Sequence, residues 1–291
     1  MTAANYHSAM RFVKGHGTEN DFVILPDPGG DLDLAPAVVA ALCDRRAGLG
    51  ADGVLRVVRA KAAVEPAVRA QADAAEWFMD YRNADGGVAE MCGNGVRVFA
   101  RYLVDAGLAA PGEWSVATRS GPRRVRLGAT GDVSVDMGPP ERLGFGTATL
   151  GGREYHGVRI SVGNPHLACR VTDPVAGLDL TRPPGLDAAV FPAGANVELF
   201  RPVGERHVEM RVYERGSGET RSCGTGAVAT AVAAAMAAAP PGGAPESVLG
   251  LPLAGEWTVD VPGGTVVVAF AGGTSELRGP AVLVAEGDVR L

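Results

Sequence analysis

Lysine is almost absent from this 291-residue sequence, which has only two, Lys14 and Lys61, among its 27 basic residues. An enzyme that uses pyridoxal phosphate needs a lysine to form a Schiff base with the cofactor. Neither lysine stands in a recognisable context for that role. The sequence therefore predicts chemistry that needs no cofactor.

Other common cofactor and metal motifs are also missing. The glycine-rich stretch from Arg45 to Gly53 contains neither the dinucleotide-binding fingerprint nor the lysine of a phosphate-binding loop. The sequence has no C-x-x-C pair and only five histidines, so a zinc site has little support. We expect no metal ion.

Charge and hydropathy disfavour two classes of partner. A net charge of −6 argues against general binding to nucleic acids. The most apolar helix candidate, from Ala227 to Ala239, is shorter than the roughly 20 residues that span a membrane, and Met1 to Phe12 lack the features of a signal peptide. We expect a cytoplasmic protein, whose cysteines would be thiols rather than disulfides in that reducing compartment.

Two of the four cysteines open the same short motif. Cys92-Gly93-Asn94-Gly95 and Cys223-Gly224-Thr225-Gly226 are each followed by a segment with a helical pattern. The first helix is expected to end near Gly107, and the second at the Pro-Pro-Gly-Gly run of residues 240–243. The repetition suggests a duplicated half-structure with one thiol from each half.

A cysteine at a helix N-terminus lies near unpaired backbone N–H groups and the positive end of the helix dipole. That position can lower a thiol pKa from about 8.5 into the range of roughly 3.5 to 7.5, so that the thiolate can act as a base. Cys43 and Cys169 have no such turn, and we interpret them as buried apolar residues.

The remaining pattern predicts an α+β fold of two pseudo-symmetric domains, each a mostly antiparallel sheet wrapped around its helix, with the active site in the cleft between them. The first domain would cover residues 1–137 and the second 138–277, and a strand in 278–291 would return to the first. A short helix is expected over 36–42. Strands are expected over 10–13, 22–25, 54–58, 75–81, 114–118, 123–127, 133–137, 155–162, 195–200, 207–213, 255–261, 265–271 and 281–285. A further strand is expected to follow the turn of residues 163–166 and to run through Val171.

Two matched thiols suit proton transfer at a carbon next to a carboxylate. To invert such a centre, a base removes the proton from one face while an acid supplies a proton to the other face. Helix N-termini can bind the substrate carboxylate and stabilise the charge that develops on it. One sulfur must be thiolate while the other is thiol, so the pair should titrate as a coupled unit.

The sequence resembles the diaminopimelate epimerase family, whose members interconvert LL- and meso-diaminopimelate in lysine and peptidoglycan precursor biosynthesis. The resemblance covers nearly the whole chain, and the two cysteine motifs with Gly-Asn-Pro-His between them are its most specific part. Its blocks are Lys14 to Phe22, Arg45 to Leu55, Asn83 to Arg97, Gly163 to His166, Asn196 to Glu198 and Tyr213 to Ala227.

The resemblance also implies roles for residues and a homodimer. Cys92 and Cys223 would be the paired acid and base. Arg215 would bind the distal carboxylate of the substrate through a planar two-point contact, and His166 and Glu214 would orient or tune the thiols. The other residues expected to bind substrate are Asn20, Asn83, Asn164, Asn196 and Glu214 through side chains, and Gly93, Asn94, Gly224 and Thr225 through the backbone.

The sequence departs from the family pattern at two places. Glu19 stands where a small or apolar residue is usual, and Gly53 replaces a glutamine that contacts substrate in some members, so that contact is not carried over. Two alternatives stay open. One is a proline or hydroxyproline racemase of the same fold, whose substrate lacks the distal carboxylate and amine. The other is a redox-sensing thiol protein.

Overall fold

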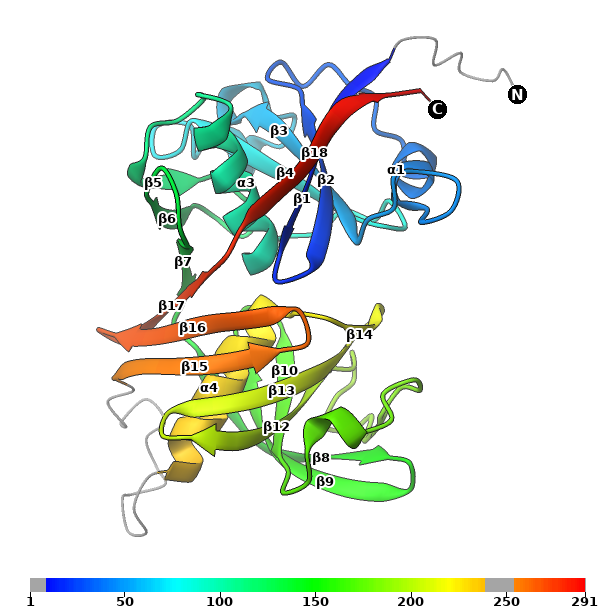
Figure 1. Ribbon diagram of the computed structural model, residues 1–291, viewed down its shortest axis with the longest axis vertical. Helices are drawn as coiled ribbons and strands as arrows, with labels where there is room; N and C mark the ends of the chain where they lie inside the picture. Colours follow the sequence, from blue (N-terminus) through cyan, green and yellow to red (C-terminus); the bar gives the residue numbers. More distant parts are fainter. Residues whose placement is uncertain (1–8, 239–253, 291) are drawn as a thin grey trace. The chain divides into compact units, whose positions relative to one another are not determined.

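The computed structural model describes residues 9–238 and 254–290. The chain divides into two compact units (Figure 1). Unit 1 comprises Met1–Val135 and Pro280–Leu291, and unit 2 comprises Asp136–Gly279. The chain therefore leaves unit 1 once and returns to it with its last strand. Among the described residues, no helix is both long and apolar enough to cross a membrane.

Five strands form the main sheet of unit 1, in the order β18-β1-β2-β3-β4. They are β1 (Met10–Gly17), β2 (Asn20–Pro26), β3 (Gly53–Arg59), β4 (Trp77–Asn83) and β18 (Val282–Val289). Every neighbouring pair is antiparallel except β2 with β3. The apolar run of residues 22–25 is fully buried, as expected for a central strand covered on both faces.

Helix α3 (Gly93–Asp105) packs on this sheet and contacts β1, β2 and β18. Its apolar residues recur at three- and four-residue spacing, and all side chains from Val96 to Leu103 are buried. Two arginines, Arg97 and Arg101, lie within that buried stretch. The helix is followed by Gly107, whose φ of 68° suits a glycine at a helix end.

The rest of unit 1 consists of short elements. They are α1 (Pro36–Cys43), the 3₁₀ turn η1 (Ala60–Ala62), α2 (Pro66–Arg69), β5 (Gly112–Val116), β6 (Arg123–Leu127) and β7 (Val133–Gly138). Strands β5, β6 and β7 form an antiparallel meander. The end of β7 belongs to unit 2, where the Oγ atom of Ser275 donates a 2.7 Å hydrogen bond to the carbonyl oxygen of Gly138.

The sheet of unit 2 runs in the order β11-β8-β9-β10-β12-β13-β15-β16-β17, with β14 paired to β13. Its strands are β8 (Glu141–Leu150), β9 (Arg153–Ser161), β10 (Pro165–Arg170), β11 (Gly185–Leu186), β12 (Asn196–Gly204), β13 (His207–Glu214), β14 (Gly218–Thr220), β15 (Gly255–Val261), β16 (Gly264–Ala271) and β17 (Thr274–Gly279). A 3₁₀ turn, η2, spans Val175–Gly177. The pairs β10 with β12 and β13 with β15 are parallel and the others are antiparallel.

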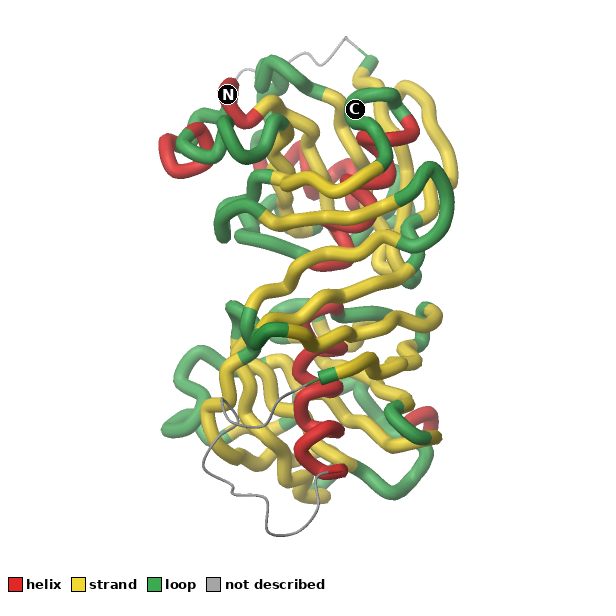
Figure 2. Tube along the Cα trace, turned by 90° about the vertical axis from the view of Figure 1, so that its left-hand side faces the viewer, coloured by secondary structure: helices red, strands yellow, loops and turns green. Residues whose placement is uncertain are grey.

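Helix α4 (Gly224–Ala238) lies against strands β9, β10, β12, β13, β15, β16 and β17 of unit 2. Figure 2 shows it as a long red helix among the yellow strands of that unit. Its sequence is mostly alanine and valine and has no polar face, and residues 226–234 are buried. Alanine has the highest helix propensity, and a helix that is apolar all round must be enclosed. The predicted α+β fold, with a mostly antiparallel sheet around one helix in each half, is confirmed.

The sequence-based expectation missed several elements. Strand β8 was not predicted because two glycines and the exposed Phe145 interrupt its pattern, and β14 and β17 are short and mostly polar. The stretch before Asp73 contains η1 and α2, whose first residue, Pro66, suits the first turn of a helix. Strand β4 begins at Trp77 rather than at residue 75. The predicted helix end at residues 240–243 lies outside the described residues.

Candidate active site

Cys92 is the N-cap residue of α3. Its backbone is extended, with φ −142° and ψ 119°, and its carbonyl accepts the first helical hydrogen bond from Val96. The N–H group of Gly95 points at the sulfur, with a nitrogen-to-sulfur distance of 3.4 Å. Cys92 thus takes the place that Ser, Thr, Asp or Asn usually fills at a helix start, as the sequence predicted.

Of the predicted asparagines, Asn20 contacts Cys92 and Asn94 contacts Asn20. The sulfur lies 3.7 Å from the Oδ1 atom of Asn20, the first residue of β2, and can donate its proton to that atom. The same oxygen accepts a 3.2 Å hydrogen bond from the Nδ2 atom of Asn94. Asn20 is 8% exposed and Asn94 only 1%. The structure therefore brings together three residues that the sequence singled out: Cys92, Asn20 and Asn94.

The turn that presents Asn20 is strained. Gly17 pairs with Asn20 across a two-residue hairpin turn, and both central residues have positive φ, 49° at Thr18 and 61° at Glu19. Such a turn favours Asn-Gly, and a branched residue at positive φ costs about 1 to 2 kcal/mol. The Thr18 hydroxyl accepts a 3.3 Å hydrogen bond from Arg97, which is fully buried. The surrounding structure thus holds a turn that its sequence alone disfavours.

A cluster of charged residues flanks the other side of Asn20. The Nδ2 atom of Asn20 donates a 2.8 Å hydrogen bond to Asp52, and Asp52 forms a 2.7 Å ion pair with Arg45. Arg45 also pairs with Asp21, which contacts Lys14 as well. Although burial opposes it, the hydrogen bonds and charges of Arg45 and Lys14 lower the pKa of Asp21 to about 2. These ion pairs and the hydrogen bond from Asn20 hold the hairpin of β1 and β2 in position.

Two predicted residues of unit 1 stand apart from this network. Asn83 ends β4 opposite Gly53, and its side chain is exposed. Gly93 is the first residue of α3, so its N–H group is one of the unbonded donors of a helix start. The predicted contact between its backbone and a substrate carboxylate stays a prediction.

Cys223 has the matching position before α4. Its carbonyl accepts from the N–H of Ala227, and the N–H of Gly226 lies 3.4 Å from its sulfur. The hydroxyl of Thr225 is 3.5 Å from the same sulfur. Burial, followed by the charges of Glu214 and Glu198, raises the pKa of the Cys223 thiol well above its ordinary value. The expectation of a lowered pKa is therefore wrong for this cysteine, because burial and two carboxylates outweigh the helix terminus.

Glu214 lies at the end of β13 and hydrogen-bonds to the Cys223 side chain. Its Oε1 atom also accepts a hydrogen bond from the hydroxyl of Thr220 on β14. Burial raises the pKa of Glu214. Glu214 thus lies beside the Cys223 thiol, where its charge raises the thiol pKa.

His166 occupies a fully enclosed position on β10. Its Nδ1 atom is 2.7 Å from the Oε1 atom of Glu198, and its Nε2 atom is 2.9 Å from the Oδ1 atom of Asn164. Strand β10 pairs in parallel with β12, which sets His166 beside Asn196 and places Glu198 two residues further along. The other carboxylate oxygen of Glu198 is buried and has no hydrogen-bond partner among the described residues.

Asn196 connects the predicted residue Arg215 to the start of β10, the strand that carries His166. Its side chain donates a 3.3 Å hydrogen bond to the carbonyl of Pro165 and accepts a 2.9 Å bond from the N–H of Arg215. The guanidinium group of Arg215 is exposed and donates to the carbonyl of Ala193 at 3.0 Å. An exposed guanidinium on a fixed backbone suits the recognition of a carboxylate.

Comparisons with known proteins identify the family of this chain. The family model for diaminopimelate epimerase matches residues 12–143 and 158–291. The chain is 63% identical to a diaminopimelate epimerase of Thermobifida fusca over 284 residues, which cover 97% of this chain and 98% of that protein. It is 53% identical to one of Mycobacterium tuberculosis over 292 residues, 96% of this chain and 97% of that protein. The chain belongs to the diaminopimelate epimerase family.

Solved structures share the fold at low sequence identity. A phenazine biosynthesis protein of the PhzF family from Bacillus anthracis has a TM-score of 0.68 at 16% identity and covers 98% of this chain and 100% of its own. A hydroxyproline epimerase from Agrobacterium vitis has a TM-score of 0.65 at 14% identity and covers 99% of this chain and 94% of its own. The racemase alternative thus rests on the fold alone, whereas the family match also rests on sequence.

The sequence analysis of this diaminopimelate epimerase family member missed four side chains: Thr18, Asp52, Arg97 and Glu198. Glu198 could have been found, because it stands two residues after Asn196 on a strand and therefore on the same face. Arg97 follows Asn94 by three residues on α3, a spacing that puts side chains in contact. Thr18 contacts Arg97 because α3 packs near the turn between β1 and β2. Asp52 contacts Asn20 because β2 pairs with β3. Neither arrangement can be read from the sequence.

The other two cysteines lie in cores. Cys43 ends α1 within an apolar cluster, and burial raises the pKa of its thiol to about 11. Cys169 lies on β10 in another cluster, and burial raises the pKa of its thiol to about 12. Both are protonated at neutral pH, as suits buried apolar residues. The described residues contain no group of three or more His, Cys, Asp or Glu arranged to hold a metal ion.

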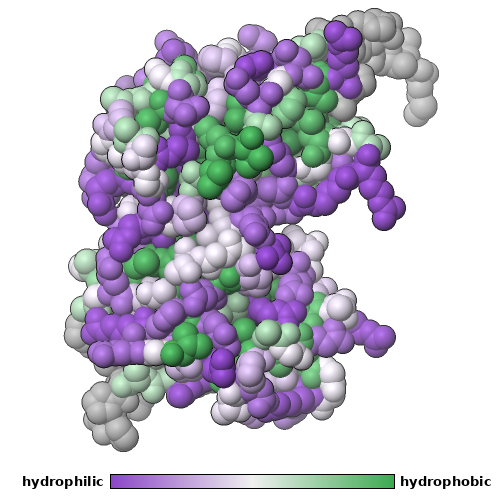
Figure 3. Space-filling view, viewed as in Figure 1, coloured by the Kyte–Doolittle hydropathy of each residue, from purple (hydrophilic) through white to green (hydrophobic). Residues whose placement is uncertain are grey.

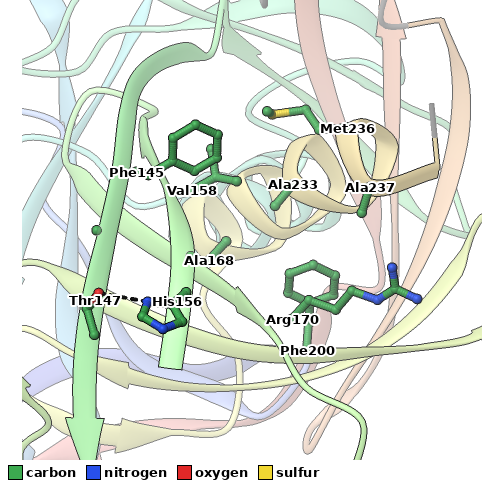
Figure 4. Close-up of a pocket in the computed structure, with 12 residues that line it drawn as sticks. Phe145, Thr147, His156, Val158, Ala168, Arg170, Phe200, Ala233, Met236 and Ala237 are labelled. Atoms are coloured by element: carbon green, nitrogen blue, oxygen red, sulfur yellow. Dashed lines mark hydrogen bonds between the residues drawn. The ribbon is translucent and has the colours of Figure 1, made fainter. Parts of the chain in front are cut away.

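A cavity of about 690 Å³ in unit 2 lies away from these residues. Figure 4 shows Phe145, Phe200 and Met236 among its apolar lining, with His156 hydrogen-bonded to Thr147 at 3.0 Å. The part of α4 that lines it begins at Ala233, ten residues and thus about 15 Å along the helix from Cys223. None of the predicted site residues lines this cavity.

Proposed function

We propose that this chain is an epimerase that interconverts LL-2,6-diaminopimelate and meso-2,6-diaminopimelate, in lysine and peptidoglycan precursor biosynthesis. The observation that carries the proposal is the repeated turn. In each unit a cysteine caps the start of the central helix, and a backbone N–H group lies 3.4 Å from its sulfur. The family match supplies the substrate.

Cys92 and Cys223 act as the two bases of the reaction. In one direction a thiolate removes the α-proton of the substrate while the other thiol donates a proton to the opposite face of the carbon. The roles exchange in the reverse direction. Each sulfur needs to be stable both with and without its proton, and the backbone N–H at each sulfur favours the thiolate. No cofactor takes part in these steps.

The substrate's reacting carboxylate binds to the backbone of Gly93-Asn94 and Gly224-Thr225, at the two helix starts. These N–H groups stabilise the negative charge that spreads onto the carboxylate as the proton leaves. Arg215 binds the distal carboxylate. Glu214 and the asparagines at positions 20, 83, 164 and 196 bind the remaining polar groups, including the amines.

Proton NMR of the reduced protein with LL-diaminopimelate in D2O, without pyridoxal phosphate, tests the proposal. We expect the α-proton signal to decay and the meso isomer to appear. Exchange with proline or hydroxyproline instead would assign the chain to the racemases of the same fold. If no amino acid exchanges while the thiols are reduced, the epimerase assignment is wrong and a redox role for the thiols takes its place.

We further infer a homodimer in the cytoplasm. Strand β18 forms an edge of the unit 1 sheet, and its Val282 and Val284 are 42% and 60% exposed. Figure 3 shows apolar surface on the face of unit 1 that carries this strand. An exposed apolar edge strand favours pairing with another chain, and thiol catalysis needs a reducing compartment. Light scattering of the wild type and of Val284→Lys tests the dimer, which the lysine should dissociate, and cell fractionation tests the compartment.

A further inference from the structure

The orientation of the Asn20 side-chain amide is fixed from both ends of a hydrogen-bonded chain. At one end Arg97, which has only donors, gives a 2.9 Å hydrogen bond to the Oδ1 atom of Asn94. The Nδ2 atom of Asn94 must then face Asn20, where it donates to Oδ1 at 3.2 Å. An amide placed by a donor-only neighbour has one satisfied orientation.

The other end of the chain imposes the same orientation independently. The carboxylate of Asp52 is held by Arg45 in a 2.7 Å ion pair and can only accept hydrogen bonds. It accepts one from the Nδ2 atom of Asn20 at 2.8 Å. Asn20 therefore has to turn its Oδ1 atom the opposite way, toward Asn94 and the sulfur of Cys92, which is 3.7 Å away.

We propose that Arg97 and Asp52 are positioning residues that hold the carbonyl oxygen of Asn20 against the sulfur of Cys92. The proposal rests on the role of Cys92 as an acid and base in the proposed function. A carbonyl oxygen accepts a hydrogen bond from the thiol but cannot donate one to the thiolate. The chain of side chains therefore favours the protonated form of Cys92 in the protein without substrate.

Arg97 is built into unit 1 as a fixed donor. It is 0% exposed, and its guanidinium group also donates to the Thr18 hydroxyl and to the carbonyl of Pro280, both at 3.3 Å. A Cβ atom on Gly17 would come within 3.0 Å of its Nη2 atom. Burial lowers the pKa of Arg97 to about 10, with the charges of Cys92 and Asp132 opposing. Arg97 thus stays a cation at neutral pH.

Charged and titratable groups surround this end of α3, and the test must separate their effects from that of the amide. They are Lys14 and His16 on β1, Asp21 on β2, Arg45 and Asp52 before β3, and Arg97 and Asp132 around the helix itself. Substitutions that keep charge, or that remove an equal charge without touching Asn20, provide that separation.

The decisive variant is Arg97→Lys, measured by site-resolved iodoacetamide alkylation of Cys92 against pH in the absence of substrate. Lysine keeps the positive charge but cannot contact Asn94, Thr18 and Pro280 together. Asn20 is then held only at its Asp52 end, so its oxygen becomes a weaker acceptor for the thiol, and we expect the alkylation midpoint of Cys92 to fall by about 0.5 to 1 pH unit. Cys223 in unit 2 is the internal control and should keep its midpoint.

Arg101→Lys is the matched control, because Arg101 is a buried arginine on the same helix whose partners are the carbonyls of Gly128, Ala129 and Gly131. It should leave the midpoint of Cys92 in place. An unchanged midpoint in folded Arg97→Lys, or an equal fall in Arg101→Lys, would overturn the proposal. The alkylation needs no substrate, so it gives a result even if the chain does not act on diaminopimelate.

Asp52→Asn provides a second test that does not depend on a buried arginine. An amide at position 52 can donate as well as accept, so it no longer holds Asn20 in one orientation, and the midpoint of Cys92 should again fall. Asp21→Asn removes the same charge from the same Arg45 cluster but leaves the Asn20 side chain untouched. A fall as large in Asp21→Asn as in Asp52→Asn would show that charge alone acts, and would contradict the proposal.

Discussion

The two cysteine turns have the same pattern of backbone hydrogen bonds but differ in the charges around them. At Cys92 the neighbours are the amides of Asn20 and Asn94, with the cation of Arg97 behind them. At Cys223 the neighbours are carboxyl groups, and burial together with Glu214 and Glu198 raises the thiol pKa. The Cys92 thiol thus has an amide oxygen as a hydrogen-bond acceptor, whereas the Cys223 thiol lies near acidic side chains. Each thiol therefore has a different physical reason to keep its proton.

The largest effect is expected from removing either thiol. Cys92→Ser and Cys223→Ser should each lower epimerisation by at least about 10²- to 10⁴-fold, the range typical of a general acid or base. Both should fold, which circular dichroism would verify, because serine is a good N-cap residue. Near wild-type turnover in either variant would contradict a two-base mechanism. Elimination from a halogenated analogue needs one base and should survive in one of them.

The sequence predicted the repeated turns because their information is local: a cysteine, two glycines and a helical pattern suffice. The resemblance then located Asn20, Asn94, His166 and Glu214. What the sequence could not predict depends on pairing between strands or on enclosure. Glu198 meets His166 because β10 and β12 are parallel neighbours in register, and the pKa of Cys223 rises because the fold buries it. A helix N-terminus can be recognised from sequence, but the burial that outweighs it cannot.

The second glycine of each turn offers the next largest contrast. At Gly226 a Cβ atom would lie 2.8 Å from the Oε1 atom of Glu198, which His166 holds, and 3.2 Å from the Cβ of Cys223. At Gly95 it would lie 3.3 Å from the end of the Leu55 side chain and 3.4 Å from the Cβ of Cys92. We expect Gly226→Ala to lower the free energy of unfolding by about 1 to 3 kcal/mol, the usual range for overpacking, and Gly95→Ala to lower it less.

Urea unfolding of both glycine variants measures this difference. The wild-type slope with denaturant should be kept, so that the change lies in stability rather than in compactness. If Gly95→Ala lowers the free energy of unfolding more than Gly226→Ala does, the close contact with the Glu198 carboxylate does not distinguish the second turn.

Removing the charge of Glu214 should reduce the difference between the charges around the two cysteines. Because that charge raises the pKa of the Cys223 thiol, Glu214→Gln should lower it, by about one unit, which corresponds to about tenfold more thiolate at a given pH. Burial still holds this pKa above the ordinary value. Site-resolved alkylation against pH without substrate measures the change as a midpoint, which restricted access does not shift. The midpoint of Cys92 should not change. An unchanged midpoint at Cys223 would contradict the proposal that Glu214 tunes its thiol pKa.

The smallest effect is expected from Thr225, which lowers the pKa of the Cys223 thiol whereas Glu214 raises it. Its hydroxyl is 3.5 Å from the Cys223 sulfur and lowers the thiol pKa. Thr225→Val keeps the shape but removes this hydrogen bond, so the alkylation midpoint of Cys223 should rise by about half a unit. Thr225→Ser keeps the hydroxyl and should restore the wild-type midpoint. A rise in the serine variant as well would mean that packing against the sulfur, and not the hydroxyl, sets the titration. With opposite shifts at Glu214 and Thr225, the proton affinity of Cys223 is a balance between acceptors that repel the thiolate and a donor that holds it.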